Sequence, residues 1–188
     1  MTPAITVRLL DAADGQDAPL VARLATLING VYAASENGLW RDAATRTTPA
    51  EVAEFIEHGE MAVATVGREL AGAVRVRALS DVTAEFGLLA SDPEHRGIGV
   101  GRRLIGFAEL HSRERGQRTM QLELLVPRTG RHPDKVFLDD WYRRIGYRVV
   151  RRTSVEDLQP QLAPLLATPC EFVIYEKPLG GLAATAGA

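Results

Sequence analysis

The chain has 188 residues, the size of a single domain slightly longer than average. Its 22 Lys and Arg residues nearly balance its 24 Asp and Glu residues and leave a formal charge of -2. This balance argues against a dedicated nucleic-acid-binding protein, because such proteins carry strongly basic surfaces. The single cysteine, Cys170, excludes an internal disulfide and a multi-cysteine metal site, so we predict a protein of the reducing cytoplasm.

No stretch of the sequence is typical of a membrane span. The longest stretches without a charged side chain, 24–35 and 158–170, are shorter than the roughly 20 apolar residues that cross a bilayer. Residues 1–8 lack the long apolar segment of a secretory signal. We therefore expect no membrane partner.

Some segments of the sequence have the hydrophobic periodicity of helices and others that of strands. The two kinds of segment are neither grouped into separate parts of the chain nor strictly alternating. The expected elements are a strand at 5–9, a helix capped by Asp17, a helix from Thr48 to Gly59, strands at 61–66, 71–79 and 84–91, a helix ending near Gly116, a strand at 120–126, a helix at 134–145, and strands at 147–153 and 171–177 flanking a short helical piece at 162–166. We predict a mixed α/β sheet in one domain at 1–179, followed by a flexible tail at 180–188.

Two helix starts can be placed from their capping residues. Asp17 precedes a helix with one apolar face, and Thr48 can accept a backbone hydrogen bond at the start of the next helix. Glu51 completes a capping box with Thr48, and Pro49 suits the first turn.

The strand expected at 71–79 has two different faces. Val74 and Val76 point to one side, whereas Arg75 and Arg77 point to the other. The arginine face is therefore solvated or binds a ligand.

A glycine-rich turn joins the strand at 84–91 to the next helix. It reads Arg96-Gly97-Ile98-Gly99-Val100-Gly101-Arg102. Glycine allows positive φ and lets a ligand approach the backbone closely, and the first N–H groups of a helix attract an anion. We predict a phosphate or pyrophosphate site here; the alternative is a plain tight turn followed by a helix cap.

Two familiar phosphate-binding loops do not fit this turn. A P-loop ends in Gly-Lys-Ser/Thr, whereas Gly101 is followed by two arginines. A dinucleotide-binding loop places its glycines directly after a strand of a βαβ unit. Here six residues, 92–97, separate Ser91 from Ile98, and the preceding strands look like antiparallel hairpins. We therefore exclude nicotinamide binding.

Two segments resemble motifs of one enzyme family. Residues 85–101, EFGLLASDPEHRGIGVG, look like motif A of the GCN5-related N-acetyltransferases (GNAT), whose Arg/Gln-x-x-Gly-x-Gly/Ala ending is matched by Arg96, Gly99 and Gly101. Residues 141–147, WYRRIGY, are similar to the family's aromatic-Tyr-x-x-x-Gly-aromatic segment. The resemblance implies the GNAT-like acyl-CoA N-acyltransferase fold, a mixed, largely antiparallel sheet flanked by helices.

The resemblance implies acetyl-CoA, or another acyl-CoA, as the acyl donor. The amides from Ile98 to Arg102, with Arg96 and Gly97 before them, would hold its pyrophosphate. In the family the pantetheine arm lies beside the strand before the loop, so by position the backbone groups of Leu89 and Ser91 would bind it. The family usually has a branched aliphatic residue where Ser91 stands, which affects the packing rather than the backbone contact.

Acyl transfer to an amine needs an acid and a base. The resemblance implies that Tyr142 protonates the CoA thiolate; the alternative is one more core aromatic on a helical stripe. It also implies that Glu85 is a base acting through water; the alternative is a solvated strand residue. Glu123 on the neighbouring strand is a weaker rival. Cys170 is not required as a nucleophile, because holding two substrates together supplies much of the acceleration.

Lys135 departs from the family, which often has an asparagine seven positions before the tyrosine to contact CoA. The lysine could instead reach a CoA phosphate, or be a solvated residue in the first turn of its helix. The acceptor in this fold is often recognised by the segment joining the first two helices, here including residues 36–40. Glu36 beside Trp40 would suit a cationic amine, or would only decorate the surface.

The predicted function is an N-acetyltransferase that moves the acyl group directly to a primary amine of a small molecule. The alternatives are a non-catalytic acyl-CoA-binding or sensing module and a protein N-acetyltransferase. The four histidines show no metal-ligand spacing, so we expect no metal. We expect no nucleic-acid partner, and a monomer or a homodimer.

Overall fold

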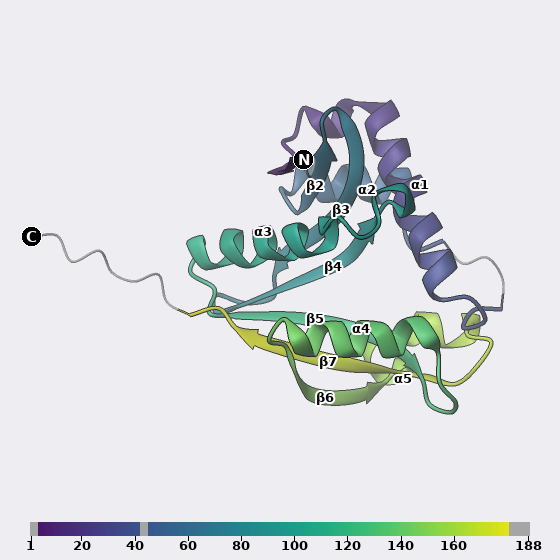
Figure 1. Cartoon of the computed structure of the whole chain (residues 1–188). Helices are drawn as coiled ribbons and strands as arrows, with labels where there is room; N and C mark the ends of the chain where they lie inside the picture. Colours follow the sequence, from purple (N-terminus) through teal and green to yellow (C-terminus); the bar gives the residue numbers. More distant parts are fainter. Residues whose placement is uncertain (1–3, 42–44, 181–188) are drawn as a thin grey trace, which may run out of the picture.

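The computed structural model of the chain describes residues 4–41 and 45–180. Its strands form one seven-stranded sheet in the order β1-β2-β3-β4-β5-β7-β6 (Figure 1). The strands are β1 (Ile5–Leu9), β2 (Met61–Val66), β3 (Glu69–Ala78), β4 (Thr83–Ser91), β5 (Thr119–Pro127), β6 (Arg148–Ser154) and β7 (Cys170–Pro178). All neighbouring pairs are antiparallel except β4 and β5, which run parallel. The predicted mixed, largely antiparallel α/β sheet is confirmed.

The helices connect these strands in the expected order. They are α1 (Ala18–Ser35), α2 (Pro49–Glu57), α3 (Val100–Glu114), α4 (Pro133–Arg144) and the short α5 (Val155–Leu158), with 3-10 turns at Asp14–Gln16, Pro93–His95 and Pro160–Leu165. The tail predicted to be flexible at 180–188 lies outside the described residues, apart from Gly180.

The predicted helix starts are present. The Asp17 side chain accepts a hydrogen bond from the Leu20 backbone N–H at 3.0 Å. Thr48 and Glu51 form the capping box in both directions, with Pro49 in the first turn of α2. These caps satisfy backbone donors that have no partner inside the helix.

Both faces of the sheet are covered by helices. One core cluster combines side chains of β2–β5 and β7 with those of α3 and α4, among them Val74, Val76 and Leu104. A second cluster joins α1 and α2 to the opposite face of the β2–β4 half. A third places Val155 of α5 against Leu125 of β5 on that same opposite face. The sheet is therefore a central layer, with α3 and α4 on one side (Figure 1).

Gly72 of β3 allows α3 to lie directly on the sheet. A Cβ at this position would come within 2.7 Å of both the Ala90 carbonyl oxygen and Val100 Cγ1. A side chain there would push the first turn of α3 away from β4. Gly72 thus fixes where the helix begins relative to the end of β4.

The sheet opens between β4 and β5. These strands pair only over 83–85 and 119–121, and the ladder ends at Glu85 and Gln121. Beyond it Leu88, alone among the described non-glycine residues, has a positive φ, of 48°. The register of β4 with β3 also shifts near this point. The two strands diverge past Glu85 (Figure 1), and we call this gap the sheet opening.

Candidate active site

The glycine-rich turn ends in the N-terminus of α3. Gly97 and Gly99 have φ values of 84° and 96°, in the left-handed region that favours glycine. Gly99 is the N-cap, no described side chain caps the helix, and Arg103 N makes its helical bond to Gly99 O at 3.0 Å. The three N–H groups before Arg103 therefore lack helical partners and are available to an anion.

The predicted loop residues surround this helix end. Arg96, Gly97 and Arg102 are exposed, so charge and backbone are accessible there. A Cβ on Gly101 would lie 3.3 Å from Ser91 Oγ and 3.2 Å from the Trp141 ring. The absence of a side chain here lets the first turn of α3 lie close to the end of β4 and to α4.

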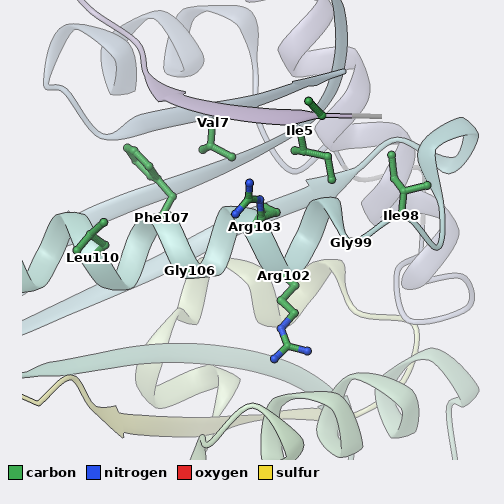
Figure 2. A pocket seen from close by; sticks show the side chains of 10 residues that line it. Ile5, Val7, Ile98, Gly99, Arg102, Arg103, Gly106, Phe107 and Leu110 are labelled. Atoms are coloured by element: carbon green, nitrogen blue, oxygen red, sulfur yellow. The ribbon is translucent and has the colours of Figure 1, made fainter. Parts of the chain in front are cut away.

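A cleft of about 840 Å³ runs from the loop along α3 and β1. Ile98, Gly99 and Arg102 line its loop end, and Ile5 and Val7 line its β1 side (Figure 2). Figure 2 shows Arg102 leaving α3 on the side away from β1. We call this hollow the loop cleft.

A second cleft, of about 530 Å³, lies at the sheet opening and is called here the central cleft. Side chains reach it from both faces of the sheet, because the strand ladder stops at Glu85. The lining includes Tyr32, Glu36, Arg46, Arg77, Glu85, Leu89, Glu123, Lys135 and Tyr142. The candidate acid and both candidate bases therefore line one cavity.

Tyr142 lies on α4 and is 6% exposed. Its ring packs against Phe86, Trp141, Tyr147 and Tyr175 at centroid distances of 5.3–6.2 Å. Burial raises the pKa of Tyr142 far above its usual range, with smaller contributions from neighbouring tyrosines. The residue is thus a core aromatic and also a protonated phenol at the wall of the central cleft.

Glu85 and Glu123 lie on the same face of the sheet, on β4 and β5. Glu85 Oε1 pairs with the Arg77 guanidinium at 2.9 Å, and its Oε2 accepts from Gln121 Nε2 at 3.3 Å. Glu123 Oε2 accepts from Gln159 Nε2 at 3.3 Å. Burial raises the pKa of Glu123, and the charge of Glu85 raises it further.

Glu36, Arg46 and Lys135 form a buried charge cluster at another wall of the central cleft. Glu36 Oε1 lies 2.8 Å from Lys135 Nζ and 2.8 Å from an Arg46 guanidinium nitrogen, and Trp40 Nε1 donates to Glu36 Oε2 at 2.7 Å. Although burial alone would raise it, the pKa of Glu36 is lowered by Arg46 and Lys135.

Residues 57–149 match the family model of the acetyltransferase (GNAT) domain. The chain carries the acetyltransferase domain of the GNAT superfamily. Like that family, it is an N-acetyltransferase. No curated protein sequence gives a significant match.

Solved GNAT structures share the fold along nearly the whole chain. The protein yncA of Salmonella typhimurium, solved with its cofactor acetyl-CoA, is 15% identical, with 98% of this chain and 99% of that one covered and a TM-score of 0.67. The ribosomal-protein-S18-alanine N-acetyltransferase of Escherichia coli is 15% identical, with 98% and 99% covered and a TM-score of 0.63. N-acetylglutamate synthase of Neisseria gonorrhoeae, solved with coenzyme A and N-acetyl-glutamate, is 16% identical, with 94% of this chain and 35% of that one covered and a TM-score of 0.62.

The charge cluster corrects two interpretations of this GNAT sequence. Lys135 is not a solvated residue of the first turn, because it is 5% exposed and its ammonium pairs with Glu36. Glu36 does not decorate the surface, since it is 3% exposed. Lys135 lines the central cleft and not the loop cleft. Its contact with a CoA phosphate stays a prediction, and the ion pair with Glu36 argues against it.

Three residues lining the central cleft of this GNAT chain were not singled out as site residues from the sequence. Tyr32 lies on the inner side of α1 and looks like an ordinary core residue in the sequence. Arg46 comes from the segment joining α1 to α2, the region expected to recognise the acceptor. Arg77 lies on the arginine face predicted for β3, and that alternation was its signal.

Two negative observations concern the described part of this GNAT chain. Within residues 4–41 and 45–180, no three His, Cys, Asp or Glu side chains are grouped as a metal site would require. None of the helices in those ranges combines the length and the apolar character that crossing a membrane demands.

Proposed function

We propose that this acetyltransferase moves the acetyl group directly from acetyl-CoA to the primary amine of a small molecule. The observation that carries the proposal is the central cleft at the sheet opening, because Tyr142, Glu85 and Glu123 all line it. Its volume of about 530 Å³ suits a small acceptor. We also propose that the enzyme works without a metal in the cytoplasm, as a monomer or a homodimer.

The donor would be held by backbone groups. The free amides before Arg103, flanked by Arg96 and Arg102, suit the pyrophosphate, because a helix N-terminus favours negative charge. The pantetheine arm would lie along the end of β4, bonding the backbone of Leu89 and Ser91. In this position the thioester would point into the central cleft, since Leu89 lines that cleft.

The reaction would then proceed in one displacement at the thioester carbonyl. A carboxylate takes a proton from the acceptor ammonium, and the free nitrogen lone pair forms a bond to the carbonyl carbon. The carbon–sulfur bond breaks, and the sulfur leaves with the electron pair. The Tyr142 hydroxyl gives its proton to that thiolate. The nitrogen is cationic after bond formation and loses its second proton to solvent. The tyrosinate then takes a proton back from solvent and the carboxyl releases the one it took, so one proton is released overall. The raised pKa of Tyr142 supports this role, because the phenol keeps its proton until the thiolate forms.

Two carboxylates compete for the role of base. Glu85 was the first candidate from the sequence, and its carboxylate is held by Arg77 and Gln121. Glu123 has one amide partner, and its pKa is raised by burial. A base with a raised pKa takes a proton more readily at neutral pH. We therefore propose Glu123 as the base, with Glu85 as the alternative.

The test is release of free thiol from acetyl-CoA by the purified chain. A panel of small primary amines and a panel of peptides are compared with a reaction lacking any acceptor. Small amines that accelerate thiol release support the proposal, and peptides that alone do so would make the chain a protein N-acetyltransferase. Thermal stabilisation by CoA without thiol release on either panel would indicate a non-catalytic binding module and overturn the proposal.

A further inference from the structure

The central cleft carries an excess of positive charge at one wall. Arg46 and Lys135 share a single carboxylate, that of Glu36, and both cations bond the same oxygen atom. Arg46 Nε is buried and has no hydrogen-bond partner among the described residues. The guanidinium also lies 5.0 Å from the centroid of the Tyr32 ring, which holds it in place. Two cations against one anion leave one positive charge facing the cavity.

The other acid near this wall does not cancel that charge. Glu51 lines the cleft, but its Oε2 accepts the Thr48 N–H at 2.8 Å in the capping box of α2. The positive end of the helix dipole offsets its charge there. Arg75, a further cation of the lining, is paired with Glu60 at 2.6 Å.

Another part of the lining, at Glu85 and Glu123, carries an excess of negative charge. Arg77 neutralises Glu85 through their ion pair at 2.9 Å. Glu123 accepts only from the uncharged amide of Gln159 among its described hydrogen-bond partners. Among the described residues, the Glu123 carboxylate is therefore left without an ion-pair partner, in the same cavity that Tyr142 lines.

We propose that the acceptor is an amine that also carries a carboxylate, as an amino acid does. Its ammonium group faces Glu123, and its carboxylate faces Arg46 and Lys135. Charge-assisted hydrogen bonds of a guanidinium to a carboxylate are directional and strong, and the Arg46 side chain lines the cleft and is 20% exposed. The inference rests on the proposed function, because it names the substrate class of the same cleft.

The test compares acceptors that differ only in the carboxylate. For α-, β- and γ-amino acids, each acid is assayed beside its carboxamide and its decarboxylated amine. We expect kcat/KM to be at least about tenfold higher for the acid of one series, the size of one charge-assisted bond. Equal values, or higher values for the uncharged partners in all series, would overturn the inference while leaving the acetyltransferase proposal standing. Absence of thiol release with every amine would instead overturn the proposed function.

A variant locates the carboxylate site. Arg46→Gln should lower kcat/KM for the preferred acid at least about tenfold more than for its carboxamide. The matched control is Arg68→Gln, at the exposed turn between β2 and β3, which should change both substrates alike. A preference for the acid that survives Arg46→Gln undiminished would contradict the proposed site. Thermal stabilisation by CoA reports whether each variant is folded. If Arg46→Gln does not fold, the comparison of acid and carboxamide acceptors on the unaltered chain decides the inference.

Discussion

Lys135 Nζ lies 2.8 Å from Glu36 Oε1, and both side chains are buried. Glu36 follows the last residue of α1, and Lys135 lies in the first turn of α4, so the pair joins helices on opposite faces of the sheet. The ion pair closes one side of the central cleft. It also links the part of the cleft lined by Glu36 and Arg46 to α4, the helix that carries Tyr142.

Lys135→Met should lower the free energy of unfolding by about 1.5–3 kcal/mol, because the buried Glu36 loses one of its two charge-assisted hydrogen bonds while Arg46 still balances its charge. Denaturant unfolding measures the change. Arg143→Gln is the matched control, since the Arg143–Asp139 pair is 2.9 Å long but exposed and should contribute less than about 1 kcal/mol. Equal effects of the two substitutions would mean that the buried pair has no special weight.

Tyr142→Phe should lower kcat about 100-fold or more and leave the affinity for CoA nearly unchanged. The substitution removes the proton donor but keeps the aromatic packing against Phe86 and Tyr175. Steady-state kinetics and a CoA titration separate the two effects. If CoA affinity and turnover fall together, Tyr142 is a packing residue only.

Gly99→Ala should weaken CoA binding about tenfold and lower the free energy of unfolding by about 1 kcal/mol. Its φ of 96° is unfavourable for a residue with a Cβ, so the loop amides would shift away from the pyrophosphate position. Gly30→Ala is the control, because Gly30 lies inside α1 with open space around it. This variant should raise the free energy of unfolding by about 0.5–1 kcal/mol and leave CoA binding unchanged. Unchanged CoA affinity in Gly99→Ala would contradict the assignment of the loop.

Glu123→Gln should stabilise the chain at pH 8 and not at pH 4. The pKa of Glu123 is raised in the folded state, so the charged carboxylate opposes folding once the pH exceeds that raised value. At pH 4 the carboxyl is largely protonated in both states and resembles glutamine. Thermal unfolding at the two pH values tests this, with the exposed Glu54→Gln as a control that should show no such difference. A Glu123→Gln variant less stable than the parent at pH 8 would refute the expectation.

Glu123→Gln should also lower kcat more than Glu85→Gln does. The base must lose its proton, so kcat of the parent enzyme should rise with pH through the raised pKa of Glu123. Glu123→Gln should lack this rise. A rise that disappears in Glu85→Gln and persists in Glu123→Gln would return the role of base to Glu85.

The elements could be predicted because their signals are local. The capping box of Thr48 and Glu51 and the alternation of Val74 and Arg75 are visible within a few residues of sequence. The loop at Gly97 and Gly99 could be placed for the same reason, since its glycines are needed for positive φ.

The walls of the central cleft could not be predicted in the same way. Glu36 and Lys135 are 99 positions apart, and no short-range pattern shows that they pair. Tyr32 follows the helical stripe of α1 as any core residue would. The positive φ of Leu88 depends on how β4 leaves β5, which is set by packing across the whole sheet.

Because the ladder between β4 and β5 is short, a donor bound along β4 would also help to hold the two halves of the sheet together. Only three residues on each strand join the two halves of the sheet there. A pantetheine arm bound along β4 would add backbone hydrogen bonds beyond the point where β4 and β5 stop pairing. The concentration of acetyl-CoA would then affect the stability of the folded chain as well as its rate of turnover. Cells depleted of acetyl-CoA would then hold a looser protein, cut more readily by proteases than the saturated form.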